Sequence, residues 1–273
     1  MQAGSDVPGR ITRMPGGVAM NIAMTLRSFG LHPILLSVVG QDPEGIDLIK
    51  AAGVLKLNTQ FLYCSRDLPT DQYMAIEGSN GLIAAIADAH SLEAAGDKIL
   101  LPLEDGRLGT PEEPFSGLIA LDGNLTVTLL SQIATSRLFS ASDLRIAPAS
   151  PGKAERLLPL LSHKGATLYV NVEEAGILCK QDFLDAQTAS RSLVARGANR
   201  ALVTDGPKAA ALADAERCVL ATPPAVLASR VTGAGDTFMA AHIAAELRGL
   251  SGVAALQSAS NAAAAYVSGK SEG

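Results

Sequence analysis

A glycine-rich stretch near the carboxyl terminus has residue types and spacing suited to binding a phosphate. It extends from Val231 to Thr237, with Thr232, Gly233, Ala234, Gly235 and Asp236 at its centre, and an apolar helical pattern follows from Phe238 to Leu247. Glycines ahead of a helix leave backbone N–H groups free to face an anion, and the helix dipole adds about half a positive charge there. The stretch therefore predicts a phosphate cradle at a helix entrance.

Asp236 places a carboxylate inside this cradle, where it would repel a bound phosphate. The placement makes sense if Asp236 accepts a proton from a hydroxyl that attacks a phosphoryl group, while the N–H groups of Gly233–Gly235 stabilise the developing charge. The alternative is structural, because a carboxylate in the first turn of a helix is favourable in any case. The residues of this stretch alone leave both explanations open.

Other motifs that could carry comparable chemistry are excluded by their residues. A dinucleotide fingerprint needs a small residue where this stretch has Phe238, and a Walker A motif ending at Ser271 needs glycine where the chain has Ala264. The four histidines are scattered and lack the spacing of metal ligands. We therefore expect the chemistry to depend on the cradle.

Composition narrows the class of partner. The net charge of −5 and the absence of any Lys/Arg cluster remove the electrostatic attraction on which non-specific nucleic-acid binding depends. No run approaches the roughly 18 apolar residues that span a bilayer, and three widely spaced cysteines without a C-x-x-C pair indicate neither a disulfide framework nor a zinc site. We expect a cytoplasmic protein that binds a small molecule, with no nucleic acid and no membrane as partner.

The elements that must position the cradle alternate between strand and helix patterns. Helical patterns cover 18–29, 45–52, 126–134, 152–161, 187–196, 238–247 and 261–267, and strand patterns cover 34–39, 118–121, 144–147, 167–170 and 201–204. The apolar runs 73–76 and 82–87 flank a predicted hairpin turn at 78–81. The segment 102–114 is typical of a loop. This alternation predicts one α/β domain over 1–273, with a mostly parallel sheet covered on both faces. Ligands bind such sheets at the carboxyl ends of the strands.

The motifs together resemble the ribokinase-like, or PfkB, carbohydrate kinases. The stretch from Val231 to Asp236 resembles the carboxyl-terminal signature of that family, and Gly16, Gly17 and Asn21 resemble its amino-terminal one. The resemblance implies a ribokinase-like fold with a small β lid, Asp236 as the catalytic base with Gly233–Gly235 as its anion hole, and a substrate bound by Gly16, Gly17 and Asn21.

The resemblance also implies ATP and Mg²⁺ as cofactors, with a monovalent cation such as K⁺ as a further candidate. Asn171 and Glu174 resemble the Asn-x-x-Glu element that positions magnesium through water, although they could equally cap the next helix. Nucleotide-binding residues implied in the same way are Asn171, Thr204, Gly206, Thr232 and Asn261. Asp42, in the turn 39–45, resembles a family turn or simply ends a loop.

Within the family, the pseudouridine kinases are the most similar subgroup. The resemblance lies in 70–88, 121–125 and 147–153, and implies that Asp88, Asn124 and Lys153 lie at or near a nucleoside. It predicts transfer of the γ-phosphoryl group of ATP to the 5′-hydroxyl of pseudouridine. The alternatives are another sugar kinase of the same family, for ribose or a similar sugar, and a ligand-binding homologue that has lost catalysis.

The beginning of the chain departs from the family pattern. Family members start with an apolar strand, whereas nothing before Gly16 predicts a strand and Met1–Arg13 resembles the lid segment that follows it. We therefore expect lid segments at about 1–14 and 70–90, and either a chain truncated at its start or a sheet without its first strand. Lid strands with an exposed edge also predict that the chain can form a homodimer.

Overall fold

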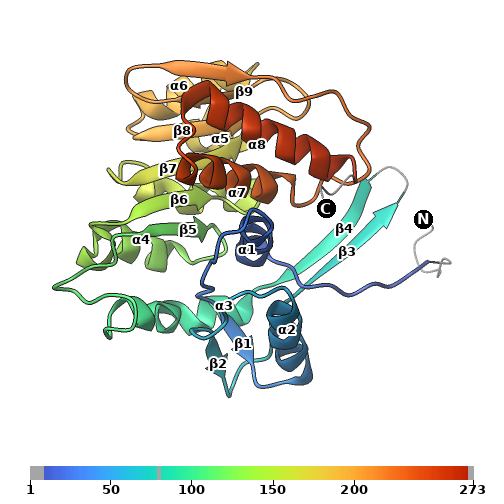
Figure 1. Ribbon diagram of the computed structural model, residues 1–273, viewed down its shortest axis with the longest axis vertical. Helices are drawn as coiled ribbons and strands as arrows, with labels where there is room; N and C mark the ends of the chain where they lie inside the picture. Colours follow the sequence, from blue (N-terminus) through green and yellow to red (C-terminus); the bar gives the residue numbers. More distant parts are fainter. Residues whose placement is uncertain (1–8, 79–80, 270–273) are drawn as a thin grey trace.

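A six-stranded sheet forms the centre of the computed structural model, which describes residues 9–78 and 81–269. Its order is β10-β9-β8-β7-β6-β5, with bounds β5 Leu118–Asp122, β6 Asp143–Ala147, β7 Ala166–Asn171, β8 Arg200–Thr204, β9 Ala210–Ala213 and β10 Cys218–Ala221. Strands β5 to β8 run parallel, and β9 and β10 are antiparallel to their neighbours. The predicted mostly parallel sheet is confirmed (Figure 1).

Helices cover both faces of this sheet, each over its own apolar core. One face carries α1 (Val18–Ser28), α7 (Ala234–Leu247) and α8 (Gly252–Val267); the other carries α4 (Val127–Thr135), α5 (Val172–Cys179), α6 (Ala186–Ala195) and the 3-10 helix η3 (Pro151–Leu160). Both cores consist mainly of Leu, Ile, Val and Ala side chains, as the small number of aromatic residues predicts. Such packing fixes α7, and with it the predicted cradle, against the sheet.

A smaller part of the chain lies beyond β5. It contains a parallel pair, β1 (Val38–Gly40) with β2 (Tyr63–Ser65), together with α2 (Pro43–Val54), α3 (His90–Ala95) and the 3-10 helix η1 (Gly96–Leu103). The short 3-10 helix η2 (Arg137–Phe139) follows α4 and contacts it. Val38 belongs to the same core as β5 to β8, so the two sheets share one interior. Within the described residues, β1 pairs with β2 alone and β5 with β6 alone.

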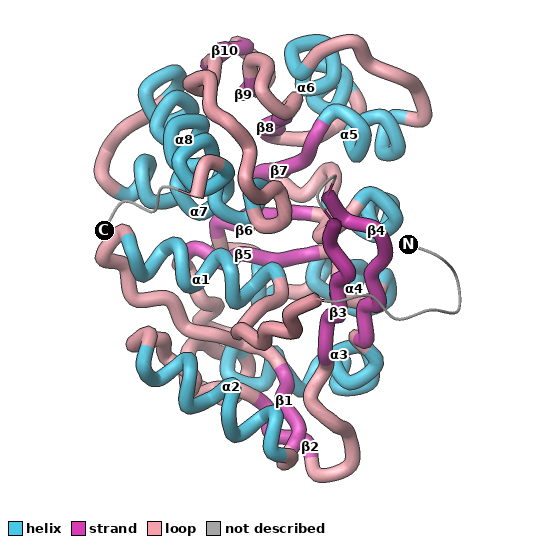
Figure 2. The backbone as a smooth tube through the Cα atoms, turned by 90° about the vertical axis from the view of Figure 1, so that its right-hand side faces the viewer, coloured by secondary structure: helices cyan, strands magenta, loops and turns pink. Residues whose placement is uncertain are grey.

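The predicted hairpin is present as β3 (Gln72–Gly78) and β4 (Gly81–Asp88), and its role as a lid stays a prediction. In Figures 1 and 2 it extends from α3 along one side of the molecule, away from the central sheet. Its turn residues Ser79 and Asn80 lie outside the described residues, as does 1–8 of the predicted lid segment 1–14. The described part of that segment, 9–14, is exposed and forms neither helix nor strand.

Several predicted boundaries were wrong for identifiable reasons. The strand expected at 34–39 is confined to β1, with Ile34 making one isolated bridge to Asn58. The helix expected at 152–161 is a 3-10 helix, and Pro159 inside it cannot donate the hydrogen bond that an α-helix needs. The loop expected at 102–114 starts inside η1, and the last helix begins at Gly252 and not at Asn261.

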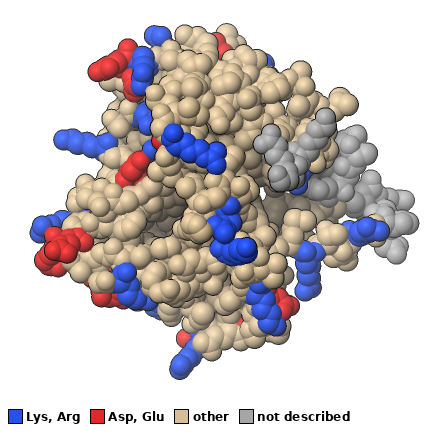
Figure 3. All heavy atoms as spheres, in the orientation of Figure 1, with Lys and Arg blue, Asp and Glu red and all other residues tan. Residues whose placement is uncertain are grey.

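Charges are distributed over the surface without a basic patch on the face that Figure 3 shows, where Lys and Arg side chains are spread singly. Among the described residues, no helix combines the length and apolar character needed to cross a membrane.

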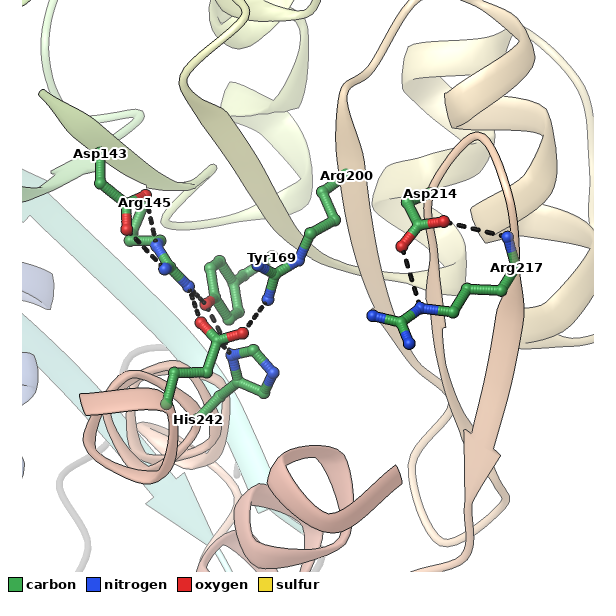
Figure 4. A network of polar contacts seen from close by, with 8 residues as sticks. Asp143, Arg145, Tyr169, Arg200, Asp214, Arg217 and His242 are labelled. Atoms are coloured by element: carbon green, nitrogen blue, oxygen red, sulfur yellow. Dashed lines mark hydrogen bonds and ion pairs between the residues drawn. The ribbon is translucent and has the colours of Figure 1, made fainter. Parts of the chain in front are cut away.

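A buried polar network anchors the end of α7 that lies farthest from the cradle (Figure 4). Glu246 accepts hydrogen bonds from Arg145 and, at 2.5 Å, from Arg200, so one carboxylate links β6, β8 and α7. Arg145 also donates to Asp143 and to the hydroxyl of Tyr169 at 2.9 Å. We call the edge of the sheet where β5 to β8 begin the amino edge and the opposite one the carboxyl edge; this network lies at the amino edge.

Candidate active site

The carboxyl edge brings together several of the polar motifs predicted from sequence. β5 ends at Asp122, level with Ala147 at the end of β6, and β7 ends at Asn171, level with Thr204 at the end of β8. This register follows from the parallel pairing, because parallel strands end at the same edge. The turns that carry Asn124, Glu174 and Gly206 therefore leave the sheet on one side, as a ligand site at this edge requires.

The entrance of α7 requires glycine at position 233. Gly233 has φ of +88°, and a Cβ there would lie 2.6 Å from the hydroxyl oxygen of Tyr266. That hydroxyl donates to the carbonyl of Thr232 at 2.9 Å, so it cannot withdraw without losing its acceptor. A side chain at 233 would therefore suffer both backbone strain and a collision.

The same entrance leaves backbone donors free. Ala234 N–H bonds to Val231 and Thr237 N–H bonds to Gly233, whereas within the described residues the N–H groups of Gly235 and Asp236 have no acceptor. Open space surrounds the position that a Cβ on Gly235 would occupy. Free donors at a helix N-terminus with space before them fit an anion such as a nucleotide phosphate.

Asp236 lies in the first turn of α7 and its carboxylate is half-buried. The Nδ2 of Asn21 donates to its Oδ2 at 2.8 Å and is its one hydrogen-bond partner among the described residues. Burial raises the pKa of Asp236 to about 6; the Asn21 bond lowers it and the charge of Asp122 raises it. A carboxylate with a pKa just below neutrality is suited to act as a general base.

Asn171 and Glu174 form a reciprocal capping box at the start of α5. The Oδ1 of Asn171 accepts from Glu174 N–H at 2.8 Å, and the Oε2 of Glu174 accepts from Asn171 N–H at the same distance. Burial, together with the charges of Glu173 and Asp236, raises the pKa of Glu174 to about 7 against the lowering effect of the cap. The structural role that the sequence left open is thus real, and it fixes a second carboxylate near Asp236.

The donor set at this edge fits a magnesium ion that arrives with a nucleotide. Capping leaves the Oε1 of Glu174 without a hydrogen bond within the described residues. Mg²⁺ commonly keeps several waters and binds through one or two carboxylates together with substrate phosphates, so it does not need a complete cage of protein ligands. Glu174 would hold the ion through water, and the free N–H groups of α7 would face the phosphates that the ion neutralises.

Gly16 and Gly17 lie at the entrance of α1, as the amino-terminal motif predicted. Gly17 caps the helix with φ of +94°, and no atom lies within 4 Å of a Cβ built on either glycine. The space in front of this turn is therefore open to a ligand.

Asn124 and Lys153, both predicted to contact a nucleoside, bind one another. The Nζ of Lys153 donates to the Oδ1 of Asn124 at 2.6 Å, and Asn124 N–H donates to the Oδ1 of Asp122 at 2.7 Å. Burial raises the pKa of Asp122, while the nearby charge of Lys153 lowers it. The prediction from sequence missed Asp122 as a member of the carboxylate group, although a carboxylate at the end of a parallel strand is a recognisable signal.

Asp88, Asn261 and Gly206 are the remaining predicted residues. Asp88, at the end of β4, accepts a 2.7 Å bond from exposed His90, which together with a backbone bond lowers the pKa of Asp88. Asn261 lies on the exposed side of α8 and accepts from Gln257, and Gly206 follows β8 with open space around it. No hydrogen bond in the described part of the chain links these residues to Asp236.

Asp42 has a structural role that fully occupies its carboxylate. It accepts from Gly45 N–H at 2.8 Å, which caps α2, and from the backbone and hydroxyl of Thr70 at 2.7 and 2.5 Å. The Thr70 bonds hold its pKa below the ordinary value. Asp42 therefore ties α2 to the start of the lid hairpin.

Comparison with known proteins gives three results. The family model described as "pfkB family carbohydrate kinase" matches residues 3–273. A sugar kinase of Escherichia coli described as uncharacterized, YeiI, is 29% identical over 250 residues, covering 89% of this chain and 66% of the relative. The pseudouridine kinase of Arabidopsis thaliana is 30% identical over 83 residues, covering 30% of this chain and 21% of the relative. The chain thus spans just under two thirds of the length of the first relative.

Solved structures share the fold. The carbohydrate kinase from Agrobacterium tumefaciens aligns with a TM-score of 0.79 at 24% identity, covering 97% of this chain and 83% of the other. Phosphofructokinase-2 from Escherichia coli aligns with a TM-score of 0.74 at 18% identity, covering 93% and 82%. These similarities establish a ribokinase-like α/β fold.

Proposed function

We propose that this chain, which belongs to the pfkB family of carbohydrate kinases, transfers the γ-phosphoryl group of ATP to the 5′-hydroxyl of pseudouridine. The observation that carries the proposal is the entrance of α7, where the carboxylate of Asp236 stands beside free backbone N–H groups. A proton acceptor and an anion site side by side are the two groups that transfer to an alcohol requires.

Asp236 acts as the base. Its carboxylate accepts the proton of the attacking hydroxyl, and the N–H groups of Gly235 and Asp236 stabilise the negative charge that develops on the transferred group. Because burial raises the pKa of Asp236 to about 6, the residue is ionised at neutral pH and still basic enough to take a proton.

The cofactors are ATP and Mg²⁺. Glu174 would hold Mg²⁺ through water, and Asn171 fixes Glu174 through the capping box; the ion would supply charge neutralisation at the phosphates. The adenosine lies toward Gly206 and Asn261, on the side of β8 and α8.

Pseudouridine as acceptor is supported by two observations. One is the local similarity to the pseudouridine kinase of Arabidopsis thaliana. The other is the hydrogen-bonded pair Asn124 and Lys153, which presents an amide and an ammonium group next to Asp122 and so could bind the polar edge of a base. A sugar is the second candidate, because the Escherichia coli relative described as a sugar kinase is similar over far more of the chain.

A coupled assay of ADP release across pseudouridine, uridine, ribose and fructose 6-phosphate tests the proposal, with ATP and Mg²⁺ present throughout. We expect pseudouridine to give the highest kcat/KM, with uridine as the matched control that differs only in its glycosidic bond. If only a free sugar is phosphorylated, the acceptor is a sugar and the proposal of a nucleoside acceptor is wrong. A rise in melting temperature with pseudouridine, without ADP, would indicate binding without catalysis.

A further inference from the structure

Asn21 and Asp236 come from two helices that pack against one another on the same face of the sheet. Asn21 lies in the first turn of α1 and Asp236 in the first turn of α7, and their side chains meet at 2.8 Å although 215 positions separate them in the chain. The neighbours Met20 and Ile22 are buried, so the backbone of α1 is held in place around Asn21. The contact is therefore built into the packing of the two helices.

The amide of Asn21 is the one group in the described part of the chain that donates a hydrogen bond to the carboxylate of Asp236. The charge of Asp122 at the end of β5 disfavours the ionised form of Asp236, and the charge of Asp236 in turn raises the pKa of Glu174 on α5. Asn21 supplies a neutral N–H donor, which stabilises the carboxylate and fixes its rotation. It engages Oδ2, so Oδ1 stays free of hydrogen bonds within the described residues.

We propose that Asn21 is a positioning residue for the base: its amide holds Oδ2 of Asp236 and so presents Oδ1 to the acceptor hydroxyl. The inference rests on the proposed phosphoryl transfer, and it differs from the role expected from sequence, in which Asn21 binds the hydroxyl groups of the substrate. The two roles predict different kinetics, because a positioning residue acts on kcat and a substrate contact acts on KM as well.

Replacement of the amide separates the two roles. For Asn21→Ala we expect kcat to fall about 10- to 100-fold, the loss typical of a hydrogen bond to a charged group, with the KM for pseudouridine unchanged. Asn21→Asp, which keeps the shape of the side chain but removes the donor and adds a like charge, should lose at least as much. Thr25→Ala, one turn further along α1, is the matched control and should keep the kcat of the wild type.

A double-mutant cycle with Asp236→Asn then identifies the group through which Asn21 acts. If Asn21 works through Asp236, adding Asn21→Ala to Asp236→Asn lowers the residual rate by less than twofold. An equal further loss in both backgrounds, or a rise in the KM for pseudouridine, would overturn the proposal in favour of a substrate contact.

A titration that needs no turnover separates this inference from the proposed function. NMR of ¹³C-labelled aspartate carboxyl groups, with Asp236→Asn to assign the signal, should place the Asp236 transition at higher pH in Asn21→Ala than in the wild type, because the bond that favours the carboxylate is gone. An unchanged transition overturns the positioning role even in an active enzyme. A shifted transition in a protein that phosphorylates none of the four acceptors supports the pairing and rejects the proposed transfer to pseudouridine.

Discussion

The two edges of the central sheet differ in how their charged side chains are paired. At the amino edge every charged group of the buried network has an opposite partner, with Glu246 held between Arg145 and Arg200 (Figure 4). At the carboxyl edge Asp122, Glu174 and Asp236 gather, and no Arg side chain binds any of the three in the described part of the chain. One helix, α7, contributes to both.

The contrast shows where the fold gains stability and where it retains chemical reactivity. Paired charges stay ionised, with the pKa of Glu246 below its ordinary value, and hold elements together, whereas burial and nearby like charges raise the pKa of Asp236 to about 6 and that of Glu174 to about 7. Carboxylates that have no positively charged partner in the folded chain are the groups that can bind a cation or accept a proton from a substrate. The carboxyl edge is therefore expected to carry function and the amino edge structure.

The largest effect should come from Asp236→Asn at the carboxyl edge. We expect kcat to fall about 10²- to 10⁴-fold, the range of a lost general base, with little change in the affinity for ATP. The melting temperature should stay the same or rise, because the substitution removes a desolvated charge and the new amide can still accept from Asn21. Steady-state kinetics and a thermal melt check the two parts, and a near-normal rate would show that Asp236 is not the base.

Glu246→Ala at the amino edge should, in contrast to Asp236→Asn, lower the stability of the folded protein. It leaves the buried Arg145 and the partly buried Arg200 without their shared carboxylate, and removal of one partner from a buried ion pair typically costs about 3–5 kcal/mol in the free energy of unfolding. Urea denaturation at pH 7.5 measures the loss. A variant as stable as the wild type would contradict the structural role given to this edge.

Glu174→Gln should make the stability of the protein less sensitive to pH. Burial raises the pKa of Glu174 from 4.5 to about 7, so its contribution to stability is complete below about pH 4.5 and is lost as the pH rises through about 7. Relative to the wild type without ligand, the variant should therefore gain up to about 3 kcal/mol between pH 5 and pH 8. Denaturation curves at these two pH values provide the test, and a constant difference would exclude a raised pKa.

The smallest effect is expected for Arg217→Ala, which breaks an ion pair with Asp214 that Figure 4 shows beside the buried network. The Arg217 side chain is 59% exposed, and solvent-exposed pairs contribute about 0–1 kcal/mol. Urea denaturation should detect a loss below about 1 kcal/mol. A cost as large as that of Glu246→Ala would mean that burial does not distinguish the two ion pairs.

Much of the fold could be predicted because its pattern is local. Alternating apolar runs identified β5, β6, β7 and β8, and the glycine-rich entrance identified α7. The short strands β9 and β10 were missed because four-residue apolar runs carry little periodicity, and their pairing depends on the tertiary fold.

The sequence predicted the individual motifs of the site but not the contacts between them. Gly233 and Asp236 follow from the types and spacing of neighbouring residues, whereas the bond from Asn21 to Asp236 joins groups from opposite ends of the chain. The pairing of Lys153 with Asn124, and the approach of Asp122 to Asp236, likewise depend on how β5, η3 and α7 pack. The pattern of residue types within one segment does not determine which other segments it contacts.

The length of α7 connects the two edges of the sheet through one rigid helix. Asp236 and Glu246 lie ten positions apart on one continuous helix, a rise of about 15 Å, and a helix of this kind transmits axial displacement with little compression. The ion pairs of Glu246 therefore fix the far end of the helix that carries Asp236.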